Sequence, residues 1–482
     1  MGGEICACVI CAKSGLQQTR RRAMSGRPVP LGMLAGIYFG DLAANLAAAS
    51  VAPKVVISSN SVLRRALASA KFVRDLTKSD FSNMPSDFQT PAASPTLWAL
   101  DPQITHLNHG AFGACPRAIL DFQRDIRLRL ESEPTRFLVR ELEPLLDAAR
   151  TELARFVGAP MENLVMVQNA TVGVNAVLRS LRFEPGDEIL VTDHEYNATR
   201  NVINYVAERT GARVVVASIP FPLQREDIIV EAILAAVTPK TKIVVVDHVT
   251  SQTGLIFPVA RLASELATRG IDLLIDGAHA PGMLALDVQA LGAAYYTGNC
   301  HKWLFAPKGA AFLYVRPDRQ EFIRPAVISH GANSARKDRS RFQIEFGWVG
   351  TGDPSAWLAV PEAIRFMEKL LPGGWSEIRE RNHALVLAGR DMLCRALGCE
   401  PPCPDELLGS LASLPLPPAP RRYEAPLFLD PLQDALLFEH NIEVPIIPWP
   451  SWPGRILRIS AQVYNCLPQY AELAAKLPAD WS

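Results

Sequence analysis

Two residues of this 482-residue chain, Asp276 and Lys302, stand where their side chains could hold a reactive group. Asp276 ends an apolar run, and Lys302 follows a polar turn that ends in His301. Pyridoxal 5'-phosphate (PLP) needs such a pair, because a carboxylate can pair with its pyridinium nitrogen and an amine can bond to its aldehyde. The pair therefore predicts a PLP site.

Each of these residues also has a structural explanation when taken alone. An aspartate after a buried strand can simply cap the next helix, and an isolated His-Lys pair carries little information. The prediction gains weight from further polar residues that follow other apolar runs in order along the chain. They are Asn169-Ala170-Thr171, Asp193-His194, Ser251-Gln252, His279, and Gly350-Thr351.

A phosphate group has a candidate partner where Ala170 and Thr171 open the helical pattern of Val172 to Leu181. The free backbone N–H groups at a helix N-terminus, together with its positive dipole end, can bind a dianion. Thr171 would add a hydroxyl, and His301 would add a further donor. The alternative is that Thr171 only caps the helix.

The elements that must position these residues follow from a regular alternation of apolar, β-branched runs with amphipathic helices. Strands are predicted at 188–192, 214–218, 243–249, 271–275 and 311–315, and helices at 118–130, 145–157, 200–209, 227–237 and 259–269. This rhythm predicts an α/β fold with a mixed, mainly parallel sheet. Ligands bind beyond the carboxyl ends of such strands.

The chain divides into four predicted parts. A basic, acid-poor extension covers 1–95, an N-terminal arm covers 96–130, and a large cofactor-binding domain covers 131–355. Two long helices at 356–371 and 375–397, a Pro-rich passage and the run Arg455 to Ser460 predict a small C-terminal α+β domain over 356–482.

The extension has three open interpretations: a targeting segment, a disordered arm, or a sequence upstream of a natural start at Met84. The protein is expected in the cytoplasm, or in an organelle if residues 1–95 are a targeting segment. The stretch from Val29 to Val51 is apolar, but Arg27 precedes it and Asp41 interrupts it, so we expect no membrane span.

The charge composition of the chain limits the kinds of molecule that it is expected to bind. The chain has 49 basic and 49 acidic residues, so no net charge favours nucleic acid or an anionic membrane. We expect a small amino acid substrate and a second copy of the chain. The nine cysteines include two close groups, Cys6, Cys8 and Cys11, and Cys394, Cys399 and Cys403, but neither has paired Cys-x-x-Cys spacing, so no metal is expected.

Four further strings complete the pattern: Leu107-Asn-His-Gly-Ala-Phe-Gly113, Glu133-Pro-Thr-Arg-Phe137, Gly298-Asn-Cys-His-Lys-Trp303 and Arg458-Ile-Ser-Ala-Gln-Val-Tyr-Asn465. With the strand-end residues, this ordered set resembles the class V aminotransferase superfamily of fold type I PLP enzymes. Within it, the chain is most similar to the isopenicillin N epimerase branch. The resemblance covers roughly Thr105 to Leu477.

The resemblance implies roles for the cofactor-binding residues. Lys302 matches the lysine that forms a Schiff base with PLP and then moves the α-proton, and Asp276 matches the partner of the ring nitrogen. His194 matches a residue that stacks on the ring. Ser251 and His279 are expected near the phenolic oxygen, although either could be a structural polar group.

The resemblance also implies a substrate pocket and a homodimer with shared active sites. Arg458 matches the residue that binds the substrate α-carboxylate, for which a planar guanidinium is suited. Asn108 and His109 of the arm are expected to close the pocket. Thr351 matches a threonine that reaches across from a second subunit.

Two departures limit the transfer of function. Cysteine desulfurases of this superfamily carry a reactive cysteine in a loop after the lysine strand, but the segment Ser329 to Phe346 has none. Cys300 stands where those enzymes usually have a serine that binds phosphate, which puts one phosphate contact in doubt.

The reaction type stays open at this level. The resemblance favours an epimerase or racemase acting at the α-carbon of an amino acid or an amino-acid conjugate. The alternatives are a C–S lyase of the cysteine desulfhydrase type, an aminotransferase, and a homologue that binds PLP without turnover. The last is disfavoured because a scaffold has no need for Lys302, Asp276 and Arg458 together. A second acid, His194 or Tyr196, would serve an epimerase.

Overall fold

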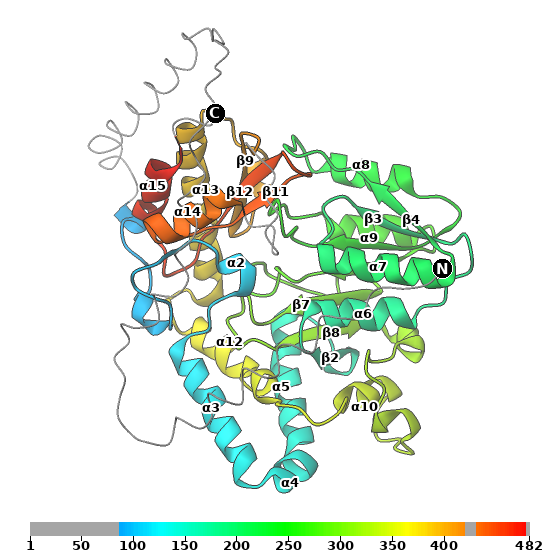
Figure 1. The fold of residues 1–482 in the computed structure, drawn as a ribbon. Coiled ribbons are helices and arrows are strands. Elements are labelled where there is room, and N and C mark those ends of the chain that lie inside the picture. The colour runs from blue at the N-terminus through cyan, green and yellow to red at the C-terminus, as the bar shows by residue number, and fades with distance from the viewer. Residues whose placement is uncertain (1–85, 420–429, 479–482) are drawn as a thin grey trace, which may run out of the picture. The chain divides into compact units, whose positions relative to one another are not determined.

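The computed structural model describes residues 86–419 and 430–478 (Figure 1). Most of the predicted extension, the group Cys6, Cys8 and Cys11, and the stretch Val29 to Val51 lie outside the described residues. Within the described part of the chain, no helix is both long enough and apolar enough to cross a membrane.

The central element is a seven-stranded sheet with the order β2-β8-β7-β6-β5-β3-β4. Only β8 runs against the others, because it pairs antiparallel with both β2 and β7. The predicted α/β fold with a mixed, mainly parallel sheet is thus confirmed. The strands are β2 (Leu164–Val167), β3 (Glu188–Thr192), β4 (Arg213–Ala217), β5 (Thr241–Asp247), β6 (Asp272–Asp276), β7 (Tyr295–Asn299) and β8 (Ala311–Val315).

Helices cover both faces of this sheet. Successive residues of β5 point to opposite faces, so Ile243 and Val245 belong to one apolar core, and Val244 and Val246 belong to the other. The first core is covered by α6 (Ala170–Ser180), α7 (Asn197–Thr210) and α10 (Arg341–Gly347). The second is covered by α5 (Leu142–Val157), α8 (Asp227–Ala236) and α9 (Val259–Ala267). Figure 1 shows α6 and α7 side by side along the sheet.

A second sheet is built from the C-terminal part of the chain. It has the antiparallel order β11-β12-β9, with β9 (Leu411–Leu416), β11 (Ile446–Pro448) and β12 (Arg455–Ser460). The helices α13 (Gly374–Leu397), α14 (Pro431–His440) and α15 (Leu467–Lys476) also come from this region (Figure 1). These elements have the α+β character expected for 356–482. The boundaries at 95, 130 and 355 stay predictions.

The remaining elements connect these parts. Strand β1 (Thr105–His106) pairs parallel with β10 (Ile442–Glu443), which joins the N-terminal arm to the C-terminal region. The other helices are α2 (His109–Phe112), α3 (Arg117–Ser132), α4 (Pro134–Arg136), α11 (Ser355–Leu358) and α12 (Val360–Glu368).

Helix α6 approaches the sheet closely at Gly173. A Cβ atom added there would lie 2.3 Å from the Oγ1 atom of Thr297 on β7, well inside van der Waals contact. That hydroxyl donates to the Phe312 carbonyl at 2.8 Å and is fixed by this bond. A glycine therefore lets the first turn of α6 lie against the sheet, and the same turn faces the site described below.

We expect Gly173→Ala to lower the free energy of unfolding by about 1–3 kcal/mol, the usual cost of an overpacked core. The sign is informative, because the same change in an uncrowded helix raises stability by about 0.5–1 kcal/mol. Urea unfolding followed by circular dichroism measures it. Gly347→Ala on α10 is the matched control, since a Cβ there meets no atom within 4 Å. Equal effects of the two variants would contradict the close approach.

Candidate active site

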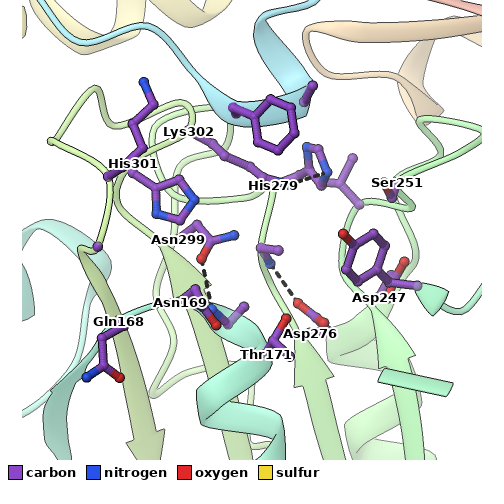
Figure 2. Close-up of a pocket in the computed structure, with 18 residues that line it drawn as sticks. Gln168, Asn169, Thr171, Asp247, Ser251, Asp276, His279, Asn299, His301 and Lys302 are labelled. Atoms are coloured by element: carbon purple, nitrogen blue, oxygen red, sulfur yellow. Dashed lines mark hydrogen bonds between the residues drawn. The ribbon is translucent and has the colours of Figure 1, made fainter. Parts of the chain in front are cut away.

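A cavity of about 340 Å³ lies beyond the carboxyl ends of the parallel strands. Seven of the predicted site residues line it: Ala170, Thr171, Ser251, Asp276, His279, His301 and Lys302. Figure 2 shows His301 and Asn299 on one side of this cavity and Asp247 and Ser251 on the other, with Lys302 and His279 between them. The sheet therefore brings together residues from separate strand ends, as a mainly parallel topology requires.

The amine of Lys302 is held by a chain of two hydrogen bonds. Its Nζ lies 2.9 Å from Nε2 of His279, and Nδ1 of His279 accepts from the indole N–H of Trp303 at 3.2 Å. Burial, and then the positive charge of Arg458, lower the pKa of Lys302 to about 8. With this pKa, about a tenth of the amine is uncharged and nucleophilic at pH 7.

Asp276 ends β6 and is nearly completely buried. Its Oδ2 accepts from the Thr199 hydroxyl at 3.1 Å, and its Oδ1 accepts from the Ala278 N–H at 3.0 Å. Burial raises the pKa of Asp276, whereas these two donors and the charge of Lys302 act in the opposite direction. The donors fix the direction of the carboxylate, and a cation beside it would hold it ionised.

Asp276 belongs to a group of three buried carboxyl groups. One carboxylate oxygen from each of Glu195, Asp247 and Asp276 lies within 4.8 Å of the other two. In the described part of the chain, no N–H or hydroxyl group donates to either oxygen of Glu195 or to Oδ1 of Asp247, and the two acids hydrogen-bond to each other. Burial, followed by the neighbouring carboxyl charges, raises the pKa of Glu195 and of Asp247 well above the usual values. This end of the cavity is therefore suited to a cationic group.

The opposite side of the cavity offers hydrogen-bond donors to an anion. The side chain of Asn169 caps α6 by accepting from the Val172 N–H, and Asn299 Oδ1 accepts from the Ala170 N–H. No hydrogen bond to the Thr171 N–H occurs in the ranges that the structure describes. This N–H and the Thr171 hydroxyl lie at the positive end of the helix dipole, where phosphate is favoured.

Asn299 lines the cavity together with His301 and Lys302, whereas Cys300 does not. Cys300 is fully buried, and burial raises the pKa of its thiol above the usual range. Cys300 does not line the cavity, so its thiol gives no contact to a phosphate there, in line with the doubt raised by the sequence. The amide of Asn299 supplies the polar group at this place.

His194 lies outside the cavity lining, and the expectation that it stacks on a bound ring does not fit its position. It is fully buried, with Nδ1 at 2.8 Å from the Thr253 hydroxyl and Nε2 at 3.0 Å from the Ile219 carbonyl. Its ring packs against Trp449 with centroids 4.4 Å apart. Both nitrogens are thus engaged in structural hydrogen bonds, and the ring makes an edge-type contact with Trp449. Tyr196, two residues later, lines the cavity instead.

Arg458, Asn108 and Ser251 form one connected group at the edge of the site. Arg458 donates through Nη2 to Asn108 Oδ1 at 3.2 Å and through Nη1 to the Ser251 carbonyl. Its Nε is buried without a hydrogen-bond partner, and burial lowers its pKa to about 10. The guanidinium is not itself in the cavity lining, but its charge acts on Lys302. A buried cation with a free N–H is suited to a carboxylate ligand.

His109 supports the backbone of Lys302 and does not line the cavity. Its Nδ1 lies 2.7 Å from the Tyr464 hydroxyl, and its Nε2 lies 3.2 Å from the Lys302 carbonyl. Burial lowers the pKa of His109 to about 3, so its ring is neutral. Asn108 likewise reaches the site only through Arg458, and its amide donates to Glu443 at 2.8 Å.

Thr351 lines a second cavity of about 340 Å³. The two cavities adjoin, since Gln168, Lys308 and Gly309 line both. Thr351 is exposed and does not reach the first cavity of its own chain. A role for it in a partner's site stays a prediction.

Sequence reasoning missed several lining residues, among them Gln168, Asp247, Asn299 and Lys308. Asp247 had the same signal as Asp276, a carboxylate after an apolar run, but the predicted strand ran on to Val249. The strand ends at Asp247, so this side chain reaches the strand edge beside Asp276.

PLP fits the donor set of this cavity. The Asp276 carboxylate at one side matches a cationic ring nitrogen, and the free N–H at the start of α6 matches a phosphate. The Lys302 amine, uncharged in part at neutral pH, lies between them and suits an aldehyde.

Comparisons with known proteins agree with this arrangement. The family model described as aminotransferase class-V matches residues 134–406. An isopenicillin N epimerase of Amycolatopsis lactamdurans is 36% identical over 79% of this chain and 98% of its own length. A probable chloroplastic L-cysteine desulfhydrase of Arabidopsis thaliana is 31% identical over 77% of this chain and 82% of its own. A solved structure of a cystine C–S lyase has a TM-score of 0.65, covering 79% of this chain and 98% of that one, at 23% identity, and shows a shared fold.

Proposed function

The chain belongs to the class-V aminotransferase family of PLP-dependent enzymes, and we propose that it acts at the α-carbon of an amino acid or an amino-acid conjugate as an epimerase or racemase. The observation that carries this proposal is the placement of Asp276 and Lys302 in one cavity, with phosphate donors on the other side. A scaffold that only bound the cofactor would have no need for a buried amine with a lowered pKa.

Each part of the cavity has a role in holding PLP. Asp276 holds the ring nitrogen, and the Thr171 N–H and hydroxyl, Asn299 and His301 hold the phosphate. Tyr196, one of two aromatic side chains with Phe112 in the cavity lining, is the candidate to pack on the ring in place of His194. When bound, PLP supplies an electron sink that stabilises negative charge at the substrate α-carbon.

The protein's own groups select and move the proton. Arg458 binds the substrate carboxylate through the N–H groups that its structural contacts leave free, and Asn108 and Ser251 orient the guanidinium. Lys302 takes the α-proton as an amine and returns it as an ammonium. Tyr196, which lines the same cavity, is the candidate for a second acid that would deliver a proton from another direction.

A C–S lyase is the second candidate, because several relatives are named as L-cysteine desulfhydrases. Relatives called L-cysteine desulfhydrases are 31% and 34% identical to this chain, against 36% and 37% for the isopenicillin N epimerases. Both activities start by removing the α-proton, and they differ only in where the electrons go next. An aminotransferase is the third candidate, because the same start can end with transfer of the amino group.

Proton NMR of the full-length enzyme with PLP in deuterated water separates these reactions. The substrates offered are alanine, cysteine, cysteine conjugates and other amino acids, with no keto acid. Loss of the α-proton signal, with both configurations recovered when the same sample is separated by chiral chromatography, supports the epimerase. Appearance of pyruvate with sulfide or a thiol shows a C–S lyase and overturns the epimerase. Turnover only after a keto acid is added identifies an aminotransferase.

The proposed assembly is a homodimer in which Thr351 completes the partner's site. Its support is the position of Thr351 in a cavity that adjoins the first one. Light scattering and PLP titration of the same sample test it. A monomer with full PLP affinity would contradict the role of Thr351, whereas a dimer in which Thr351→Val binds PLP several-fold more weakly would support it.

The proposed location is the cytoplasm, or an organelle if residues 1–95 direct import. A relative described as chloroplastic gives some support to the second possibility. A fusion of residues 1–95 to a fluorescent protein distinguishes the two, because only a targeting segment moves the fluorescence out of the cytoplasm.

A further inference from the structure

Trp303, the residue after Lys302, determines which nitrogen of His279 carries a proton. The indole N–H can only donate, and its acceptor is Nδ1 of His279 at 3.2 Å. Nδ1 must therefore be the unprotonated nitrogen. A neutral imidazole has one N–H, so the proton of His279 lies on Nε2.

The fixed tautomer constrains the amine of Lys302. His279 Nε2 lies 2.9 Å from Lys302 Nζ, and a protonated Nε2 can only donate to it. An ammonium group has three donors and no lone pair, whereas a neutral amine can accept. The two hydrogen bonds are mutually compatible only when Lys302 is uncharged.

We propose that Trp303 is a positioning residue whose indole N–H fixes the tautomer of His279 and thereby favours the neutral amine of Lys302 before PLP binds. The inference rests on the proposed function, in which Lys302 is the residue that bonds to PLP. It concerns only the resting proton positions, so no bond is made or broken. Trp303 acts on Lys302 through His279 and does not line the cavity.

The charged groups around Lys302 act on its pKa in opposite directions, so an additional contact can decide its protonation state. Asp276 and Asp247 act on Lys302 to raise its pKa, whereas Arg458 and burial lower it. Burial lowers the pKa of His279 well below its usual value, and the positive charge of Arg458, with that of Lys302 whenever Lys302 is protonated, acts in the same direction. The carboxyl groups thus favour the protonated form of Lys302. The N–H that His279 donates to Lys302 Nζ favours the neutral form, because only a neutral amine can accept it.

The arrangement around Trp303 is rigid enough for this role. The side chain is 1% exposed, and its ring lies 4.9 Å from the ring of His109, measured between centroids. His109 in turn contacts the Lys302 carbonyl at 3.2 Å. Trp303→Phe keeps an aromatic ring in this place and removes the N–H, so it is the variant of choice.

The first measurement is ¹⁵N NMR of histidine-labelled, full-length protein without PLP. We expect Nε2 of His279 to be protonated and Nδ1 to be unprotonated in the original sequence. In Trp303→Phe we expect a mixture of both tautomers. A His279 with its proton on Nδ1 in the original protein would overturn the proposal.

The second measurement is the rate at which the protein captures PLP, followed by absorbance as a function of pH. This rate reports the neutral fraction of Lys302. We expect Trp303→Phe to lower the rate near neutral pH by about fivefold to tenfold, the usual effect of one lost hydrogen bond, and to shift the pH midpoint upward. An unchanged midpoint would overturn the proposal.

A double-mutant cycle separates this role from packing. The side chain of His279→Gln has no tautomers, and its amide N–H can donate to Lys302 with or without the indole. We expect Trp303→Phe to shift the midpoint less in the His279→Gln background than in the original one. Equal shifts in both backgrounds would show that Trp303 acts through packing alone.

Two controls keep the outcomes distinct. Trp375→Phe removes another buried indole N–H, which donates to the Ile364 carbonyl far from Lys302 in the sequence, and should leave the midpoint unchanged. Lys302→Ala tests the underlying function. If Lys302→Ala captures PLP as a covalent adduct at the original rate, the proposed function fails. If only the Trp303 shift is missing, the function stands and this inference fails.

Discussion

Replacing Lys302 with alanine is expected to lower kcat/KM by about a thousandfold or more. The variant loses the nucleophile that attaches PLP and the base that moves the α-proton, and general-base catalysis alone contributes about 10²–10⁴-fold. The cavity should otherwise be preserved, because among the residues that the structure describes the Lys302 side chain hydrogen-bonds only to His279. Steady-state kinetics on the substrate identified by NMR measures the loss.

The site of attachment can be tested independently of activity. Borohydride reduction of the loaded enzyme, followed by peptide mass mapping, should find the cofactor on Lys302. Lys308 is the matched control, since it lines the same cavity and donates to the Gly113 carbonyl at 2.9 Å. Lys308→Ala should keep the modified peptide, and a modification on Lys308 in the original protein would refute the assignment of Lys302.

The elements that could be predicted from the sequence are those with strong local patterns. Strands β3 and β8 have the predicted bounds, because each is an apolar or β-branched run between clear turns. Strand β7, with the sequence Tyr-Tyr-Thr-Gly-Asn, lacks such a pattern. Its burial comes from its neighbours β6 and β8 and is not encoded locally.

The sequence predicted which kind of cofactor the site binds better than it predicted which side chains face the cavity. Asp276 and Lys302 follow from chemistry and from strand ends, where topology alone places side chains together. The direction of a side chain in a loop is a different matter. Whether His194 or Tyr196 faces the cavity depends on the turn after β3, and the turn directs His194 toward Thr253 and Ile219. No feature of the local sequence determines that choice.

Replacing Asp276 with asparagine is expected to cause the second large loss of activity, because in the proposed function this buried carboxylate pairs with the positively charged ring nitrogen of PLP. Asp276→Asn keeps the size of the side chain and an oxygen that can accept from Thr199 or Ala278, so the fold should be retained. It removes the negative charge that keeps the ring nitrogen protonated. Removing one partner of a buried ion pair costs about 3–5 kcal/mol, which corresponds to roughly a hundredfold to several-thousandfold in kcat/KM.

The informative comparison for Asp276→Asn is Asp247→Asn, which makes the same chemical change on the adjacent strand. The oxygens of the two side chains lie within 4.8 Å of each other, but burial and the Asp276 charge favour the protonated, uncharged form of Asp247. Neutralising a group that is already largely neutral should cost little, so we expect less than a tenfold loss for Asp247→Asn. The absorbance of bound PLP should change in Asp276→Asn alone. Equal losses in the two variants would mean that the negative charge is shared among the buried carboxyl groups. Asp276 would then not be the specific partner of the ring nitrogen.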